Sequence, residues 1–453
     1  MQFRDAEQAG TLGFGTPELV PHAIAGRKAA GGTDMPGLAR KRVAFVIAHL
    51  GPGGAQRVAA NAANAFAEQG IDMHIIIANE NKCVYRLDSR VTVHASPFGN
   101  GQFASSAEGE SEAPSTETQG GASAERKQSR LHRLFRKIVP QGSISGSRAR
   151  PLLYPLFALI FAVDLVRRTL WLRRQIRAIK ADAVLAFLTQ TNILTVLATR
   201  GLNTRTVISE RNDPRLQRHR PRVELMRRFV YRRADVVTAN SRGALVALES
   251  FVPKAKLAFL PNPLSLPAST EIAPLAAPTI ITVGRLVEQK GLDVLLAAWA
   301  GAVPDLPGWR LAIVGDGPLR DELGALARKL KIEDSVDWHG HVSDPFPLLR
   351  ASEFFVLTSR FEGTPNALLE AMACGLPGVV SDASPGPCEL VGADQSAGLI
   401  VPVEDADATA KAMIRLARED GLRNKLAGGA RERAREFESD RALKVWLELL
   451  AGT

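Results

Sequence analysis

The chain has 453 residues, of which 45% are hydrophobic and 23% charged, and its net charge at pH 7 is +10. This length exceeds one ordinary domain core and fits two, and the composition is that of a soluble globular protein. The three cysteines form no Cys-x-x-Cys pair, which argues against a disulfide framework, so we expect a cytoplasmic protein.

The positive charge is concentrated in two stretches. Residues 126–180 hold 14 Lys or Arg and one acid, and residues 200–233 hold 11 Arg and three acids. A local excess of this kind indicates a local anionic partner, either lipid headgroups or a phosphorylated acceptor. Nucleic acid is disfavoured because these stretches lack interleaved aromatic residues. No apolar run reaches the roughly 20 residues of a membrane span, and residues 1–10 lack the pattern of a signal peptide.

Regular structure is expected to begin at Arg42. Residues 1–40 show no sustained periodicity and are interpreted as a disordered leader. VAFVIAHL, residues 43–50, indicates a buried parallel strand, and a helix is predicted from Gln56 to Gln69. A second strand follows in IDMHIIIA, residues 71–78. This βαβ unit predicts a parallel sheet with crossover helices.

Two unusual segments follow. Residues 99–150 contain a tract rich in Ser, Gly and Glu, and we expect a disordered insertion. Leu152 to Lys180 predicts a long helix, apolar in its first half and rich in Arg in its second. One interpretation places this helix on the inner face of the cytoplasmic membrane, as a peripheral contact with anionic lipid. The other makes it a core helix of the first domain with a solvated Arg face, and both stay open.

Alternation of strand and helix then resumes. The predicted elements before the linker are strands in ADAVLAFL (181–188), TVISE (206–210) and DVVTAN (235–240), with helices at 192–199 and 223–232. Four prolines between 261 and 274 indicate a linker. Beyond it, strands are predicted in TIITVGRL (279–286), RLAIVGDG (310–317), SVDWHG (335–340), FFVLTS (354–359) and GVVSD (378–382).

The fold class is therefore α/β, with two doubly wound domains. We expect the first over residues 41–265, the second over residues 266–435, and a final helix within residues 436–453 that crosses back to the first domain. A ligand is expected in the cleft between the domains, at the carboxyl ends of the strands.

The most informative motif is FEGTPNALLEAMACGLP, residues 361–377. Its helix is predicted to begin at Pro365 or Asn366 and to end at Gly375. The free N–H groups of Gly363, Thr364, Asn366 and Ala367 at this helix start are expected to bind phosphate. Pro365, at the helix start, is expected in the same donor-binding site. Glu362 and Glu370 bracket this turn, so that one carboxylate can face a sugar while the other reaches ribose hydroxyls.

A second motif, TVGRLVEQKGLD, supplies cations. Gly284 and Arg285 follow a predicted strand, and Lys290 lies in the next loop. A departing pyrophosphate develops charge on its oxygens, so two fixed cations there bind the group and lower the barrier.

Two glycine turns accompany these motifs. In AIVGDGPLRDEL, the segment Gly315–Asp316–Gly317 makes a tight turn that either packs or meets the ligand. It lacks the third glycine of a dinucleotide-binding fingerprint. In WHGHV, Gly340 lets a nucleobase approach the backbone of His341 and Val342.

The acceptor side is expected in the first domain. GPGGAQR places Gly53 and Gly54 at a strand end and Arg57 one turn into a helix. SERNDP places a polar cluster at another strand end, formed by Glu210, Arg211 and Asn212. No residues have zinc-like spacing, and Arg285 and Lys290 can carry the charge of the leaving group, so no metal or cofactor is expected.

Together these motifs resemble family four of the retaining glycosyltransferases, which have the GT-B fold of two Rossmann-like domains facing a cleft. The resemblance spans residues 42–435 without the insertion, and its most specific element is the E-x7-E pattern from Glu362 to Glu370. It implies that Glu370 holds the ribose, Arg285 and Lys290 the diphosphate, and Glu362 the donor sugar. It also implies that the loop in the 340s frames the base.

GPGGAQR and FLTQTN…SERNDP look like the bacterial branch that builds lipid-linked oligosaccharides and exopolysaccharides. Many family members have a His on the acceptor side, where this chain has Glu210–Arg211–Asn212. Gly378 also stands where the family usually has Val.

The expected reaction moves a hexosyl or N-acetylhexosaminyl group from a nucleotide diphosphate sugar, with UDP as the expected nucleotide. The acceptor is a glycan or a polyprenyl-diphosphate-linked saccharide. No residue is placed as a covalent nucleophile, which favours front-face substitution with retention and without a metal. Two alternatives are a sugar-nucleotide epimerase of the same fold and a non-catalytic nucleotide-sugar-binding subunit.

Overall fold

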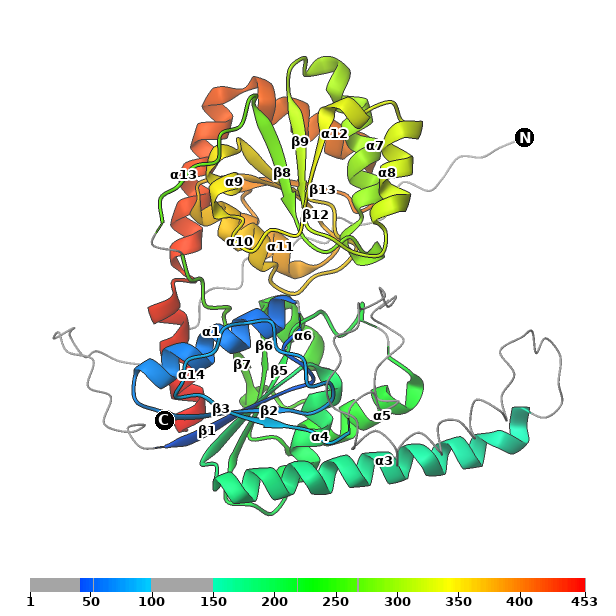
Figure 1. Cartoon of the computed structure of the whole chain (residues 1–453), viewed down its shortest axis with the longest axis vertical. Coiled ribbons are helices and arrows are strands. Elements are labelled where there is room, and N and C mark those ends of the chain that lie inside the picture. The colour runs from blue at the N-terminus through cyan, green and yellow to red at the C-terminus, as the bar shows by residue number, and fades with distance from the viewer. Residues whose placement is uncertain (1–40, 52, 99–149, 218, 267–268, 453) are drawn as a thin grey trace, which may run out of the picture. The chain divides into compact units, whose positions relative to one another are not determined.

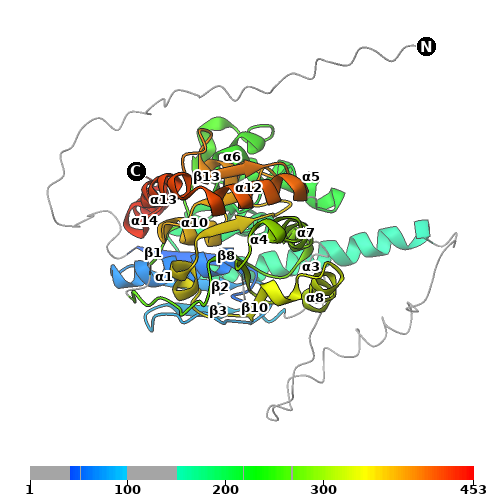
Figure 2. The same ribbon diagram turned by 90° about the horizontal axis from the view of Figure 1, so that it is seen from above.

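The computed structural model describes residues 41–51, 53–98, 150–217, 219–266 and 269–452. Side chains of helix α3 are described from residue 161 onward. The predicted leader and nearly all of the predicted insertion lie outside the described residues. Figures 1 and 2 show the described elements from two directions.

The first sheet is built from seven parallel strands in the described part of the chain, in the order β3-β2-β1-β4-β5-β6-β7. Its inner strands are buried on both faces, which explains their continuous apolar sequences. The strands are β1 (Arg42–Ile47), β2 (Asp72–Ile77), β3 (Thr92–Ala95), β4 (Ala183–Phe187), β5 (Arg205–Glu210), β6 (Val236–Ala239) and β7 (Leu257–Phe259).

Helices cover both faces of this sheet (Figure 1). The helices in this half are α1 (Gly54–Glu68), α3 (Arg150–Ile179), α4 (Thr189–Thr199), α5 (Pro221–Val230), α6 (Arg242–Leu248) and the 3-10 helices η1 (Tyr231–Arg233) and η2 (Lys254–Lys256). One core cluster joins the sheet to α1 and to the last helix, and the other joins it to α3, α4 and α5.

The second sheet has six parallel strands in the order β10-β9-β8-β11-β12-β13. They are β8 (Thr279–Val283), β9 (Arg310–Val314), β10 (Val336–Gly340), β11 (Phe354–Leu357), β12 (Gly378–Ser381) and β13 (Gly398–Val401). Its helices are α7 (Leu292–Ala302), α8 (Arg320–Lys329), α9 (Phe346–Ala351), α10 (Asn366–Ala373), α11 (Pro385–Val391), α12 (Ala406–Arg418), α13 (Asp420–Arg435), η3 (Glu288–Lys290), η4 (Val303–Asp305) and η5 (Glu333–Ser335).

The last helix, α14 (Ser439–Ala451), belongs to the core of the first sheet. Trp446 is fully buried, and its ring lies 6.0 Å from that of Phe45 and 5.9 Å from that of Phe187. Its indole N–H donates to the carbonyl of Pro261. The predicted division of the chain near residue 265 falls in an irregular segment, and the independence of the two parts stays a prediction.

Both sheets confirm the predicted α/β class with doubly wound parallel topology. The predicted strands are all present, with ends trimmed by a few residues, and the long helix is present as α3. The short elements α6, β7 and β13 were not predicted. Helix α4 begins three residues before the predicted start, directly after Leu188, whose φ of 74° is left-handed.

Helix α3 contributes Leu172, Ile176 and Ile179 to the first core. The core-helix interpretation therefore holds for that face of the helix. None of the helices in the described residues is long and apolar enough to cross a membrane.

Strand order places the two switch points where ligands bind in doubly wound sheets. In each sheet the chain reverses direction across one strand pair, β1 and β4 in the first and β8 and β11 in the second. Crevices open at the carboxyl ends of such pairs because the two following loops diverge to opposite faces. The loop after β8 contains Arg285 and Lys290, and the loop after β11 contains Glu362.

Candidate active site

The loop after β11, residues 358–365, is here called the α10 loop. It ends at Pro365, which caps α10, and the helix stops before Gly375, whose φ of 86° is left-handed. This confirms the predicted helix and its glycine stop. The backbone N–H groups of Gly363 and Thr364 donate to no other described residue, so they are available to an anion.

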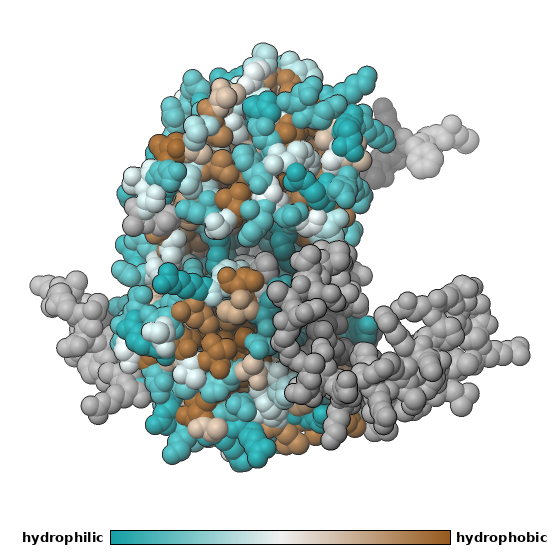
Figure 3. Space-filling view, viewed as in Figure 1, coloured by the Kyte–Doolittle hydropathy of each residue, from teal (hydrophilic) through white to brown (hydrophobic). Residues whose placement is uncertain are grey.

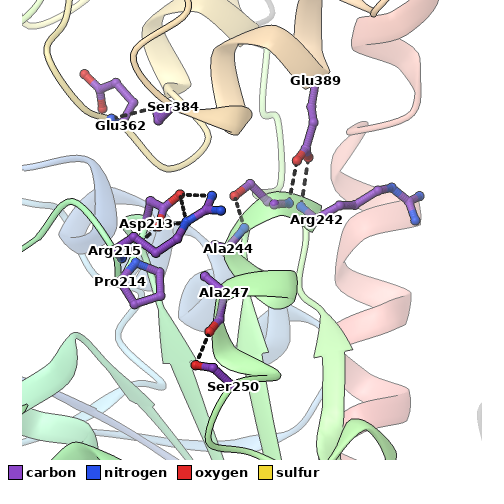
Figure 4. Close-up of polar contacts among 12 residues, drawn as sticks. Asp213, Pro214, Arg215, Arg242, Ala244, Ala247, Ser250, Glu362, Ser384 and Glu389 are labelled. Atoms are coloured by element: carbon purple, nitrogen blue, oxygen red, sulfur yellow. Dashed lines mark hydrogen bonds and ion pairs between the residues drawn. The ribbon is translucent and has the colours of Figure 1, made fainter. Parts of the chain in front are cut away.

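Glu362 is held in the α10 loop by three contacts. Its N–H donates to Ser384 Oγ at 3.0 Å, as Figure 4 shows. Its Oε1 accepts from Ser359 Oγ at 2.9 Å and from Lys290 Nζ at 2.5 Å. The structure therefore brings together the cation of one predicted motif and the carboxylate of another, 72 residues apart in the chain.

Arg285 lies beside this pair in a different state. Its side chain is exposed and forms no ion pair or hydrogen bond with the described residues. A Cβ on Gly284 would lie 3.2 Å from Lys290 Cε, so the small residue leaves room for the lysine. Arg285 is thus a free guanidinium next to a partly enclosed ammonium.

Gly315 and Gly317 have a packing role. Gly315 has φ 141°, and a Cβ there would collide with the carbonyl of Gly284. A Cβ on Gly317 would lie 2.5 Å from the carbonyl of Leu286. Close approach of the loops after β8 and β9 explains both glycines without a ligand. Asp316 is exposed, and its Oδ1 accepts from the N–H of Gly317.

The loop after β10 lies against the same edge. The N–H of Gly315 donates to Gly340 O at 2.7 Å, and a Cβ on Gly340 would meet nothing within 4 Å. His341 is exposed, and Val342 packs partly on the core of the second sheet. The space beside Gly340 is open, and the binding of a base there stays a prediction.

Glu370 is a buried carboxylate with one free oxygen. Its Oε1 pairs with Arg57 Nη2 from α1, and its Oε2 has no hydrogen-bond partner in the described structure. Burial raises the pKa of Glu370, Arg57 opposes that shift, and Asp344 adds to it. A pocket of about 280 Å³ adjoins these residues, lined among others by Arg57, Asn61, Ser343, Asp344, Asn366 and Glu370.

The glycine-rich loop of the first half reaches the same place. Gly53 is the residue before α1, and its N–H and carbonyl both bond to the hydroxyl of Tyr85. The carbonyl of Gly54 accepts from Asn366 Nδ2 at 3.2 Å. Gly54 and Arg57, at the start of α1 in the first half, thus contact α10 in the second half, as expected for a loop that faces the cleft.

The expectation for Glu210 is wrong in one respect. Its side chain is 1% exposed, and its carboxylate accepts from Thr189 Oγ1 and from the hydroxyl of Tyr231. Burial raises its pKa, although Arg227 opposes the shift. A carboxylate enclosed in this way holds the loop in place and presents no oxygen to an acceptor. Asn212 is half-buried.

Arg211 is also buried, and it belongs to a network that the sequence did not reveal. Its Nη2 donates to Asn262 Oδ1 at 2.5 Å. Asn262 Nδ2 in turn donates to Thr364 O at 3.1 Å and to Asn366 Oδ1 at 2.5 Å. Burial lowers the pKa of Arg211 to about 9. The chain of polar contacts ties the end of β5 to the α10 loop.

Asn262 lies among the linker prolines, and no motif there indicates a polar contact with the α10 loop. Asn240 was equally unmarked in the sequence, yet its carbonyl accepts from Thr364 Oγ1. No group of three or more metal-ligand side chains gathers within the described ranges.

Comparison with known proteins covers both halves of the chain. The profile described as "Glycosyl transferase 4-like domain" matches residues 53–263, and that of "Glycosyl transferases group 1" matches residues 271–433. A Campylobacter jejuni protein named N-acetylgalactosamine-N,N'-diacetylbacillosaminyl-diphospho-undecaprenol 4-alpha-N-acetylgalactosaminyltransferase is 32% identical over 290 residues. That match covers 61% of this chain and 78% of the relative.

Two further similarities extend over most of the chain. A second C. jejuni protein, an alpha-1,4-N-acetyl-D-galactosaminyltransferase named for a diNAcBac-PP-undecaprenol-linked saccharide, is 26% identical over 412 residues. The match covers 90% of this chain and 98% of the relative. The structure of sucrose-phosphate synthase from Thermosynechococcus elongatus matches with a TM-score of 0.66 at 16% identity, covering 91% of this chain and all of that one.

Proposed function

The chain belongs to the group 1 glycosyl transferases with the GT-B fold, and from this premise we propose a specific reaction. It transfers a hexosyl or N-acetylhexosaminyl group, with retention, from a UDP-sugar to a saccharide carried on polyprenyl diphosphate. The observation that carries the proposal is the Lys290–Glu362 pair beside the unused amides of Gly363 and Thr364, at the switch point of the second sheet.

The donor is proposed to bind across the loops of the second sheet. Lys290, Arg285 and the amides of the α10 loop receive the diphosphate, since cations and a helix start both favour its charge. The free Oε2 of Glu370 accepts hydrogen bonds from the ribose hydroxyls, which gives this buried oxygen the partner it lacks. Glu362 then faces the sugar, and the base lies at Gly340 and His341.

The proposed chemistry is front-face substitution. The bond from the sugar C1 to the diphosphate oxygen breaks while the acceptor hydroxyl oxygen bonds to C1 on the same face. The hydroxyl proton passes to the departing diphosphate oxygen. Lys290 and Arg285 stabilise the charge that develops on the leaving group, so no metal or cofactor is needed.

The acceptor class is proposed from the relatives. The names of both Campylobacter proteins describe a saccharide linked to undecaprenyl diphosphate. The two proteins also match most of their own lengths to this chain. A polyprenyl anchor would hold this substrate in a membrane, which raises the question of how the chain meets it.

Helix α3 offers a surface for that meeting. Val163, Val166 and Leu170 are 49%, 54% and 60% exposed, and their spacing of three and four residues puts them on one face. Hydrophobic side chains show at the lower margin of Figure 3, where Figure 1 places α3. The exposed Arg174 and Arg177 continue this face. We propose that the stripe contacts anionic lipid at the inner face of the cytoplasmic membrane.

Flotation with vesicles tests the membrane contact. The full chain is expected to float with vesicles containing phosphatidylglycerol and not with neutral ones, and Leu170→Glu should reduce flotation. The control is Val403→Glu, which makes a similar change at an exposed residue of the second half. Leu330→Glu is not suitable as a control because Leu330 packs on a core. Equal behaviour on both vesicle types would remove the membrane contact.

The reaction is tested with the purified full chain. UDP- and GDP-sugars are first screened for thermal stabilisation, because a ligand that binds the folded state raises the melting temperature. Transfer to a lipid-linked saccharide is then measured, and the anomeric configuration of the product is read by NMR. Loss of transfer in EDTA with rescue by Mg²⁺ would contradict the metal-free mechanism, and an inverted product would contradict retention.

The same assay separates the alternatives. An epimerase would isomerise a nucleotide sugar without any acceptor. A non-catalytic subunit would bind nucleotide sugars and turn over none of them on any acceptor tested. We expect neither result.

A further inference from the structure

A second pocket, of about 550 Å³, lies in the first half of the chain and takes no part in the donor site described above. It opens between residues 214–217 and 219–221, helix α5 and the end of α6, and we call it the Arg227 pocket. Figure 4 shows Pro214 and Arg215 on one side of it, with Ala247 and Ser250 near the other. Its charged and polar lining residues are Arg215, Gln217, His219, Glu224, Arg227, Arg228 and Ser250.

The pocket carries an excess of positive charge. Three guanidinium groups and one carboxylate line it, while burial lowers the pKa of His219 and favours its neutral form near pH 7. Arg215 pairs with the buried Asp213 at 2.6 Å, and Arg227 pairs with Glu224 at 2.6 Å. Arg228 is exposed and has no partner in the described part of the chain. A small anion would therefore find one uncommitted cation at the rim.

Arg227 gives an independent indication of a ligand. The residue is 4% exposed, and its Nη2 donates to Pro214 O and to Glu224, yet Nε and Nη1 have no acceptor. A buried donor without an acceptor costs about 1–3 kcal/mol, and more when it is charged. A phosphate group matches the two-pronged geometry of a guanidinium and would supply the missing acceptors after a small rearrangement.

The pocket lies close to the point of transfer. A Cβ on Gly363 would collide with the carbonyl of Arg211, so the α10 loop touches the chain directly after β5. Two residues, Asn212 and Asp213, separate Arg211 from Pro214 in the pocket wall, and the span from Arg211 to Pro214 is at most about 11 Å. The α10 loop, which contains Glu362, is therefore joined to the wall of the Arg227 pocket by a short stretch of chain.

Helix α5, which lines the pocket, also contacts the helix with the proposed lipid contact. Arg222 on α5 stacks over the ring of Phe161 on α3, with 4.3 Å from Cζ to the ring centroid. An anionic group at the base of a lipid chain would thus enter between α5 and the end of α6 while its chain stays near α3.

We propose that the Arg227 pocket binds the diphosphate group of the lipid-linked acceptor. The proposal rests on the function given above, because it assigns a second diphosphate to a protein whose donor diphosphate already has Arg285 and Lys290. An acceptor built on polyprenyl diphosphate carries the anion at one end and the reactive hydroxyl at the other. The pocket then sets how far that hydroxyl reaches toward Glu362.

Binding is tested first, without any turnover. The full chain is titrated with geranyl diphosphate, geranyl monophosphate and inorganic phosphate by calorimetry, in the presence of excess UDP to occupy the donor site. We expect geranyl diphosphate to bind tightest and Arg228→Gln to weaken it about tenfold. The matched control, Arg233→Gln, removes the same charge at an exposed site outside the pocket and should leave binding unchanged.

Several results would overturn the proposal. Equal affinity of Arg228→Gln and the unaltered protein would remove the pocket from the site, and equal weakening by Arg233→Gln would reduce the effect to general charge attraction. Inorganic phosphate that binds as tightly as geranyl diphosphate would contradict an acceptor lipid. Complete displacement by UDP would place the ligand in the donor site.

Kinetics separate this proposal from the proposed function. In a transfer assay, Arg228→Gln should raise KM for the lipid-linked acceptor about tenfold and leave KM for the donor unchanged. Arg227→Lys keeps the buried charge and should raise acceptor KM further, since an ammonium lacks the fork that matches phosphate. If the unaltered protein transfers no sugar, the proposed function fails while the titrations still decide the pocket. Transfer with an unchanged acceptor KM in both variants would reject the pocket alone.

Discussion

Glu370 and Glu210 are both buried carboxylates whose pKa is raised by burial, but their surroundings differ. Glu370 pairs with Arg57, adjoins a pocket and keeps one oxygen without a partner. Glu210 lines neither of the two pockets described above, and the hydroxyls of Thr189 and Tyr231 donate to its carboxylate. Burial and a raised pKa are thus common to a carboxylate proposed to bind the donor and to one held by its neighbours. The unpaired atom beside open space distinguishes the two.

The largest effect is expected where the donor region is most specialised, at Lys290. Lys290→Ala should lower kcat by about 10²–10³-fold, because its contact strengthens as the leaving group gains charge. Initial rates at saturating donor and acceptor give the measurement. Lys329→Ala, an exposed lysine on α8, serves as the control and should not change kcat. An unaltered kcat in Lys290→Ala would remove the proposed role.

The next largest effect should distinguish the roles of the two carboxylates, Glu370 and Glu362, in UDP binding. Glu370→Gln is expected to weaken UDP binding by about 10–100-fold, the range for hydrogen bonds to a charged group. Glu362→Gln should leave UDP binding unchanged, because UDP lacks the hexosyl group that Glu362 is proposed to contact. Calorimetry with UDP measures both variants. Equal losses in the two would mean that the carboxylates do not have separate duties.

The contact between the two regions can be disturbed at Gly363. Gly363→Ala places a Cβ against the carbonyl of Arg211. The resulting overpacking should cost about 1–3 kcal/mol in any conformation that keeps this contact. We expect kcat/KM to fall about tenfold. Gly428→Ala provides the control, since its Cβ would meet nothing within 4 Å on helix α13, and it should stabilise slightly. Matching rates in the two variants would show that the contact is dispensable.

The smallest kinetic effect is expected at Glu210. Glu210→Gln keeps hydrogen bonds to its neighbours and should change kcat and acceptor KM by less than about threefold. Its signature is in stability against pH. The folded protein holds the proton of Glu210 above the ordinary pKa of 4.5, so folding stability falls as pH rises from there through the raised pKa.

Denaturation at several pH values between 4 and 8 measures that slope. Glu210→Gln has no such titration, so its stability relative to the unaltered protein should increase over this window. A large loss of kcat in Glu210→Gln would return the residue to the reacting groups.

The fold, and the meeting of Lys290 with Glu362, could be predicted from the sequence because both depend on local rules. Apolar runs located the strands, and the Pro365 and Gly375 boundaries located α10. The motif residues of the donor region then converge because carboxyl ends of parallel strands share one edge. This reasoning needs no knowledge of distant contacts.

Other features depended on contacts between distant segments. Glu210 looks like a ligand-facing residue at a strand end, and only the hydroxyl of Tyr231 shows otherwise. Asn262 joins Arg211 to Asn366, which neither local propensity nor spacing reveals. The Arg227 pocket lies within a stretch whose basic character is evident from the sequence. The lack of acceptors for Arg227 Nε and Nη1 arises only in the folded chain, so no sequence pattern indicates it.

The position of Trp446 has a consequence for how the protein is made. Its ring completes a cluster with Phe45 and Phe187, about 400 and 260 residues earlier in the chain. As the ribosome extends the chain, the first sheet is made long before the aromatic ring that seals its core. The nascent first half therefore exposes an apolar face of its sheet until α14 has been made. Chaperone dependence during synthesis should accordingly fall on the half that emerges first.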